Sequence, residues 1–270
     1  MTTLTHSLRD TMTMLRRDIK HSLRYLPMTI SGMATPTVML LLFNYVYGGA
    51  MGAGLGGAAH GGAYINYLAP GILIMAVGSG CATTAVNLAT DMSEGIIARF
   101  RTMAISRVSV LTGTVVGSLI RTIISVVLFA GVALLIGFRP TTNPLAWLVA
   151  LALVALIALG VSWMGIAFGL YGKTPTGANS LSLIFLLLAF TSSAFVNPAT
   201  MPNGVRQFAE YQPFTPVIDS LRGLLLGTPV SASSVIQAIV WCIALALVGY
   251  FWSRAIYNRN TVAYNLSAAR

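Results

Sequence analysis

The most telling part of the chain reads YLAPGILIMAVGSGCATTAVN, at residues 67–87, and it contains no charged residue. A helix needs about 20 mainly apolar residues to cross a hydrocarbon core roughly 30 Å thick. The chain offers five further apolar runs of this kind along its 270 residues. Their number and length predict a polytopic membrane protein.

The composition supports this prediction. The chain is 56% hydrophobic and only 8% charged, with a mean hydropathy of +0.80, whereas a soluble domain carries about a quarter charged residues. The net charge of +10 comes without a basic patch interleaved with aromatic residues, so we interpret it as topology information and not as a nucleic-acid interface. Cys81 and Cys242 both lie in apolar runs, and no disulfide framework is expected.

We expect an all-α fold with six transmembrane helices between residues 27 and 256. The predicted spans are residues 28–48, 67–90, 112–137, 144–171, 179–197 and 234–255. Before them, residues 1–26 repeat apolar side chains at three- and four-residue steps beside a basic face. This pattern predicts an amphipathic helix on the cytoplasmic leaflet, with a solvated cytosolic helix as the alternative. Residues 257–270 are expected to form a cytoplasmic tail.

Lysine and arginine near the span ends predict the orientation. With both termini in the cytoplasm, the inner segments carry twelve cations, and the outer segments carry three: Arg139, Arg206 and Arg222. The even number of spans and the basic termini agree with this arrangement.

Two connections are too long and too patterned to be passive turns. Residues 91–111, on the inner side, mix apolar and charged side chains and predict a short helix across the cytoplasmic surface. Residues 198–230, on the outer side, are rich in proline and glycine. Within them, Thr215 is predicted to cap a helix with Pro216 at its first position. Because that helix is too short to span, we expect an external re-entrant hairpin.

The chain lacks the residue patterns of an enzyme. The sequence GKT at 172–174 has Ala167 where a phosphate-binding loop needs glycine, so Lys173 is interpreted as an anchor at the inner surface. Histidines and cysteines do not occur at metal-binding spacing. We therefore expect no catalytic residue, no metal and no cofactor bound by this chain.

Polar residues inside the predicted spans leave two interpretations open. Ser79, Thr83 and Asn87 recur at four-residue intervals, so they could line a wettable pathway or form hydrogen bonds between helices. Arg121 is the single charge within a span, and it could snorkel, pack or serve the transport path. Proton-coupled carriers usually place a carboxylate or histidine inside the membrane, and none is found there in this sequence.

Two segments resemble the signatures of type-2 ABC export permeases, in particular the daunorubicin-resistance branch. They are DMSEGIIARFRTMAISRVSVLTG at residues 91–113 and QPFTPVIDSLRGLLLG at residues 212–227. The family positions in the first segment are filled by Asp91, Glu94, Gly95, Arg99, Phe100, Arg101, Ser106, Arg107, Leu111 and Gly113. The chain departs from the pattern at Ala104, commonly proline, and at Gln212, usually asparagine.

The resemblance implies a permease subunit in a bacterial plasma membrane that acts as a dimer with an identical or homologous permease. A separate ABC ATPase, in two copies, would bind ATP and Mg. A coupling helix at about 104–113 would contact the ATPase, and the external hairpin would gate release. The residues expected to couple are Glu94, Arg99, Arg101, Ser106, Arg107 and Leu111. Those expected to line the translocation path are Ser79, Thr83, Asn87, Phe185 and Ser192.

The expected substrate is an amphipathic or apolar molecule such as a drug, an antibiotic or a lipid, which would make the protein a multidrug efflux component. Lipid-linked glycan or polysaccharide export is an alternative. So are a secondary carrier that does not use ATP and a membrane scaffold without transport activity. Transport that depends on ATP and on the partner ATPase would separate these hypotheses.

Overall fold

The structure is a computed structural model that describes residues 26–48, 63–94, 107–141 and 143–268. Within these ranges it is all-helical, with no strand. The elements are α2 (Leu26–Tyr45), α4 (Ala63–Ser93), α6 (Arg107–Ile136), α7 (Pro144–Gly172), α8 (Pro175–Phe190), the short 3-10 helix η1 (Pro198–Thr200), α9 (Asn203–Tyr211), α10 (Phe214–Leu226) and α11 (Ala232–Ala268). The prediction of an all-α fold is confirmed for the described residues.

Among the residues that the structure describes, four helices are long and apolar enough to cross a membrane. They are Tyr64–Ser93, Leu111–Ile136, Pro144–Gly172 and Ala232–Tyr257. The remaining two predicted spans coincide with α2 and with α8, which is apolar but only 16 residues long. A multi-span membrane protein is therefore confirmed, and the count of six spans stays a prediction.

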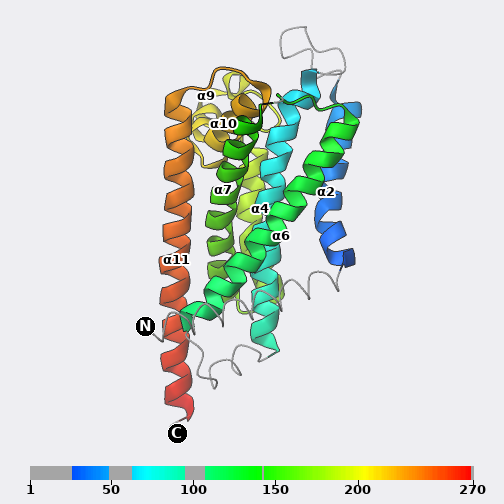
Figure 1. Cartoon of the computed structure of the whole chain (residues 1–270). Coiled ribbons are helices and arrows are strands. Elements are labelled where there is room, and N and C mark those ends of the chain that lie inside the picture. The colour runs from blue at the N-terminus through cyan, green and yellow to red at the C-terminus, as the bar shows by residue number, and fades with distance from the viewer. Residues whose placement is uncertain (1–25, 49–62, 95–106, 142, 269–270) are drawn as a thin grey trace.

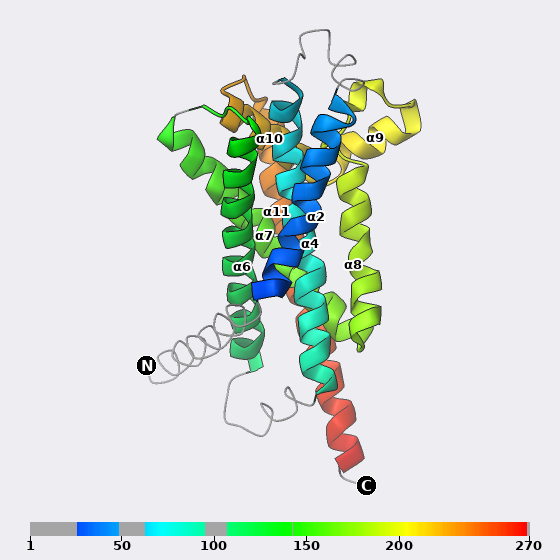
Figure 2. The ribbon, with the colours of Figure 1, turned by 90° about the vertical axis from the view of Figure 1, so that its right-hand side faces the viewer.

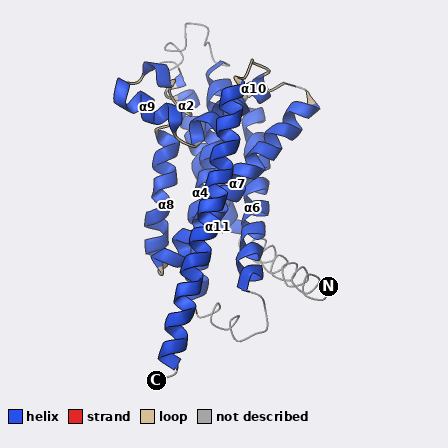
Figure 3. Ribbon diagram, turned by 90° about the vertical axis from the view of Figure 1, so that its left-hand side faces the viewer, coloured by secondary structure: helices blue, strands red, loops and turns tan. Residues whose placement is uncertain are grey.

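Helix α7 lies at the centre of the bundle, between α4 and α11 (Figures 1 and 3). Glycines permit this packing: a Cβ added at Gly165 would lie 2.8 Å from the carbonyl oxygen of Cys81 on α4. On the other side, a Cβ at Gly160 would lie 3.0 Å from the carbonyl oxygen of Cys242 on α11. Small residues at such contacts let membrane helices approach closely and gain van der Waals packing. Together α4, α7 and α11 form the packed centre of the protomer.

Helix α10 runs antiparallel beside the first half of α4. Phe214, its first residue, packs on Gly78 at the midpoint of α4, because a Cβ added at Gly78 would lie 3.6 Å from the Phe214 ring. Arg222, two turns later, reaches the backbone of Tyr67 near the start of α4. The pairing indicates that α10 begins beside the middle of α4 and ends near the start of α4.

The described cations near helix ends fall into two groups, one at each end of the bundle. The carboxyl ends of α4 and α11, the start of α6 and the α7–α8 turn with Lys173 lie at one end of the bundle (Figures 1 and 2). The opposite end carries α9 and α10, with Arg206 and Arg222. This grouping agrees with the grouping expected from the sequence.

The predicted fifth span, 179–197, extends too far. Helix α8 ends at Phe190 and is followed by turns at Thr191–Val196, so Ser192 lies beyond the helix. The cap predicted at Thr215 is also wrong, since α10 begins at Phe214 after Pro213. The Thr215 hydroxyl instead accepts a hydrogen bond from the Ser193 N–H at 3.2 Å.

Two segments near the predicted inner surface, the coupling helix and the tail, do not form separate elements in the described residues but belong to longer helices. Residues 107–113 of the predicted coupling helix form the first turns of α6, and residues 104–106 lie outside the described residues. Helix α11 continues to Ala268 and so includes most of the segment predicted as the tail. The amphipathic helix predicted at residues 1–26 falls almost entirely outside the described residues.

Candidate functional site

One face of α4 carries uncharged polar side chains that the protomer covers only in part. Ser79 is exposed, and Thr83 and Asn87 are half-buried, whereas α4 is otherwise largely enclosed by its neighbours. The Ser79 hydroxyl donates to the Ala76 carbonyl at 2.7 Å, and the Thr83 hydroxyl donates to the Ser79 carbonyl at 3.3 Å. Since both hydroxyls bond within their own helix, they do not join α4 to another helix of the protomer. We call Ser79, Thr83 and Asn87 the polar face of α4.

Interhelical hydrogen bonding is performed by a different set of hydroxyls. Thr84 bonds to Ser118 on α6, and Ser118 bonds at 3.1 Å to Ser162 on α7. All three side chains are at most 3% exposed. This chain of hydroxyls ties α4, α6 and α7 together inside the bundle. In the sequence, the only sign of these hydrogen bonds is the presence of small polar residues in apolar runs.

Phe185 does not join the polar face of α4. It is buried between Phe168 of α7 and Phe214 of α10, with ring centroids 6.0 and 5.9 Å away. In this arrangement Phe185 packs α8 against its neighbours. Its contact with Phe214 also connects it to α10, and its assignment to the translocation path stays a prediction.

Ser192 likewise holds the backbone together after α8. It is fully buried, its hydroxyl donates to the Ala189 carbonyl at 2.6 Å, and it accepts from the Ala194 N–H at 3.2 Å. These bonds satisfy groups left free where the helix stops. In hydrocarbon, irregular backbone is tolerated only when such groups find partners inside the protein.

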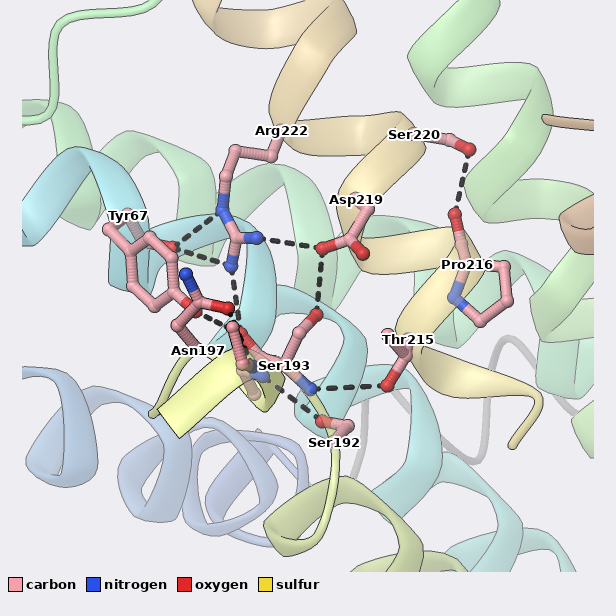
Figure 4. Close-up of polar contacts among 11 residues, drawn as sticks. Tyr67, Ser192, Ser193, Asn197, Thr215, Pro216, Asp219, Ser220 and Arg222 are labelled. Atoms are coloured by element: carbon pink, nitrogen blue, oxygen red, sulfur yellow. Dashed lines mark hydrogen bonds and ion pairs between the residues drawn. The ribbon is translucent and has the colours of Figure 1, made fainter. Parts of the chain in front are cut away.

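A polar cluster at the outer end completes this arrangement (Figure 4). The Arg222 guanidinium donates to Asp219 Oδ1 at 2.8 Å, to the Ser193 carbonyl at 2.9 Å and to the Tyr67 carbonyl at 3.2 and 3.3 Å. It also stacks 3.8 Å above the centre of the Tyr67 ring. We call Tyr67, Ser193, Asp219 and Arg222 the outer polar cluster.

The outer polar cluster is closed by its own members. Tyr67 Oη donates to the Ser193 carbonyl at 3.0 Å, and Ser193 Oγ donates to Asp219 Oδ1 at 2.8 Å. The cluster therefore links α4, the turn after α8 and α10. The sequence identified Arg222 only as an outer cation, because two of its partners lie far along the chain: Ser193 is 29 residues away and Tyr67 is 155 residues away.

The residues expected to couple are only partly described. Glu94 is exposed just past the end of α4, and its N–H donates to the Thr90 carbonyl at 2.9 Å. Leu111 is 5% exposed and packs with Leu88, Trp163 and Tyr257, which lie on α4, α7 and α11. Arg107 is the first residue of α6. The other three, Arg99, Arg101 and Ser106, lie outside the described residues.

The packing of Leu111 is an observation that the sequence alone did not provide. It sits in a small apolar core that joins the first turns of α6 to three neighbouring helices. Through this core the start of α6 contacts α4, α7 and α11 by packed side chains.

Arg121 is half-buried on α6 and interacts with another group of the chain. The GKT segment forms the α7–α8 turn: Lys173 adopts a left-handed conformation with φ 57°, and the Thr174 side chain caps α8 by accepting from the Gly177 N–H at 3.1 Å. This geometry is that of a helix–helix connection. In the described ranges no three acidic, histidine or cysteine side chains gather as a metal site would require.

An all-helical bundle with several spans and a partly exposed polar face on a largely enclosed helix fits the architecture of a membrane permease. Residues 9–226 match the family of ABC-2 type transporters, and the chain belongs to this family. The resemblance seen in the two sequence segments is thereby confirmed.

The relatives of known description agree. The chain is 29% identical over 217 residues to the daunorubicin resistance ABC transporter permease protein DrrB1 of Streptomyces coeruleorubidus, a match that covers 80% of this chain and 74% of that protein. It is 24% identical over 181 residues to the probable doxorubicin resistance ABC transporter permease protein DrrC of two Mycobacterium tuberculosis strains. These matches cover 67% of this chain and 65% of DrrC.

Proposed function

We propose that this chain is the transmembrane permease subunit of an ABC exporter that moves amphipathic, drug-like molecules out of a bacterial cell. Membership of the ABC-2 type transporter family supports the permease role. The names of the relatives, which are daunorubicin and doxorubicin resistance permeases, support an amphipathic drug as the substrate class.

The observation that carries the proposal is the polar face of α4. A helix that is otherwise largely enclosed presents Ser79, Thr83 and Asn87 on a side that the protomer covers only in part. In Figure 2 the lower part of α4 is visible between α2 and α8. A second permease placed against this side, identical or homologous, would enclose a path lined by hydroxyl and amide groups. Such a lining suits a molecule with both apolar and polar parts.

Energy would come from a separate ATPase in two copies, which would carry ATP and Mg. The connection before α6 would rest on that ATPase, and the apolar core around Leu111 supports the idea that its movement spreads to α4, α7 and α11. Rigid packing of this kind moves as a unit, so closure of the ATPase would tilt the inner ends of these helices.

The orientation follows from the cations. We propose that both termini and the α7–α8 turn with Lys173 face the cytoplasm, and that α9 and α10 face outward. The pairing of Phe214 with Gly78 and of Arg222 with Tyr67 supports a hairpin that re-enters to the middle of α4. The hairpin would then cover the outer mouth of the path.

Reconstitution tests this function. The chain is incorporated into vesicles with the ATPase encoded beside it, and daunorubicin uptake into inside-out vesicles is measured with and without ATP. We expect uptake that requires ATP and both proteins, with vesicles that contain only the ATPase as the control. Uptake that follows a proton or sodium gradient and ignores ATP would instead assign a secondary carrier.

A further inference from the structure

Gln212 has a buried side-chain amide without a hydrogen-bond partner. The residue is 4% exposed, and neither Nε2 nor Oε1 has a partner within the part of the chain that the structure describes. Its backbone is satisfied, because the Gln212 N–H donates to the Phe208 carbonyl at 3.1 Å. An unpaired buried polar group costs about 1–3 kcal/mol. Native proteins keep few such groups, and each calls for a physical reason.

The position of Gln212 suggests that reason. It forms the turn between α9 and α10, and two residues later the ring of Phe214 packs on Gly78 and on Phe185. Gly78 directly precedes Ser79, the first residue of the polar face of α4. Gln212 therefore lies at the end of α10 that contacts the middle of α4, two residues before the side chain that packs on Gly78.

The two helices on either side of Gln212 are held very differently. Helix α10 is almost wholly buried and is fixed by the outer polar cluster, whereas Ala209 is the single buried residue of α9. Helix α9 contacts mainly α10 and η1. Helix α9 is therefore the less firmly held of the two helices that meet at Gln212.

We propose that Gln212 is a substrate-binding residue whose amide forms hydrogen bonds with the hydroxyl or carbonyl groups of the transported molecule when the α9–α10 turn opens. This inference rests on the proposed function. A primary amide offers both a donor and an acceptor without charge, so it can pair with an amphipathic molecule at low cost in desolvation. In the closed protomer the same amide stays unpaired, which raises the free energy of the closed arrangement. The open, substrate-bound arrangement is favoured by the same amount.

The chain offers a matched control for the test. Gln212→Met removes the hydrogen-bonding groups at similar volume, and Gln207→Met makes the same change at an exposed position on α9. Gln212→Asn keeps an amide on a shorter side chain. Each variant is purified with the partner ATPase in vesicles, and two quantities are measured: the daunorubicin concentration that gives half-maximal stimulation of ATP hydrolysis, and the melting temperature of the permease.

We expect Gln212→Met to raise the half-maximal daunorubicin concentration about five- to tenfold, as the loss of one or two hydrogen bonds predicts. Its melting temperature should equal or exceed that of the wild type, because the unpaired amide is gone. Gln207→Met should match the wild type in both measurements, and Gln212→Asn should lie between.

Two results would overturn the inference. One is an unchanged half-maximal concentration in Gln212→Met. The other is a lower melting temperature together with a lower maximal stimulation of ATP hydrolysis at an unchanged half-maximal daunorubicin concentration. That result would make Gln212 a packing residue. If daunorubicin does not stimulate hydrolysis even in the wild type, the substrate class of the proposed function fails and the inference fails with it. The wild-type measurement thus distinguishes the two failures.

Discussion

At the scale of single residues, Arg222 does more than any other described side chain to hold the outer end together. Its guanidinium serves one carboxylate and two backbone carbonyls and covers an aromatic ring. The Ser193 carbonyl belongs to the irregular segment after α8, where no helical partner exists. A planar group with five donors suits this task, and lysine could not make the same set of contacts.

Replacing Arg222 by methionine is therefore expected to lower the free energy of unfolding by about 1–3 kcal/mol. The half-exposed position of Asp219 keeps this loss below that of a fully buried pair. The measurement is thermal or denaturant unfolding of the purified permease in detergent. The control is Arg206→Met, whose partner Glu210 is exposed like Arg206 itself; its effect should stay under about 0.5 kcal/mol. Equal losses in the two variants would contradict the role assigned to Arg222.

At the scale of elements, close approach at glycine decides how α7 packs. Gly165→Ala places a methyl group 2.8 Å from the Cys81 carbonyl oxygen, which is backbone and cannot move aside easily. We expect a destabilisation of about 1–3 kcal/mol from this overpacking. Gly131→Ala on α6 is the matched control, because its new methyl group meets nothing within 4 Å. Stability measured for both variants should fall only in the first, and a fall of similar size in the second would refute the packing explanation.

The positions of the long helices could be predicted from the sequence. The spans at 67–90, 112–137, 144–171 and 234–255 each coincide with a helix within a few residues at the start, because long uncharged runs leave a membrane chain no alternative to helix. The end of α8 could not be predicted, since Ser192 and Ser193 are tolerated in membrane helices. The break there is fixed by Thr215 and Arg222, which lie more than 20 residues further along the chain.

The candidate site was predicted to a similar extent. Spacing alone grouped Ser79, Thr83 and Asn87 on one face, because residues four apart share a side of a helix. The burial of Phe185 and Ser192 depends on how α8 meets α7 and α10, and one sequence does not contain that information locally. In the sequence, Gln212 differs only in replacing the asparagine that is usual at this family position. The burial of its side-chain amide without a hydrogen-bond partner is visible only in the structure.

At the scale of the whole molecule, the orientation can be tested by labelling intact cells. Ser106→Cys should resist a thiol reagent that does not cross membranes, since we place it in the cytoplasm. Asn203→Cys, at the exposed start of α9, should react. The native Cys81 and Cys242 are buried and should stay silent. Modification of Ser106→Cys from outside would reverse the topology and remove the ATPase contact that the proposed mechanism requires.

The central claim is that the polar face of α4 lines the path of the substrate. The most direct measurement compares Thr83→Cys, on that face, with Ala85→Cys, on the buried side of the same helix. Both are treated with a small water-soluble thiol reagent in the permease–ATPase complex, with and without daunorubicin. We predict that Thr83→Cys reacts and that daunorubicin slows its reaction, while Ala85→Cys stays unmodified. An inert Thr83→Cys, or equal reaction at both positions with no protection by the drug, would contradict the account.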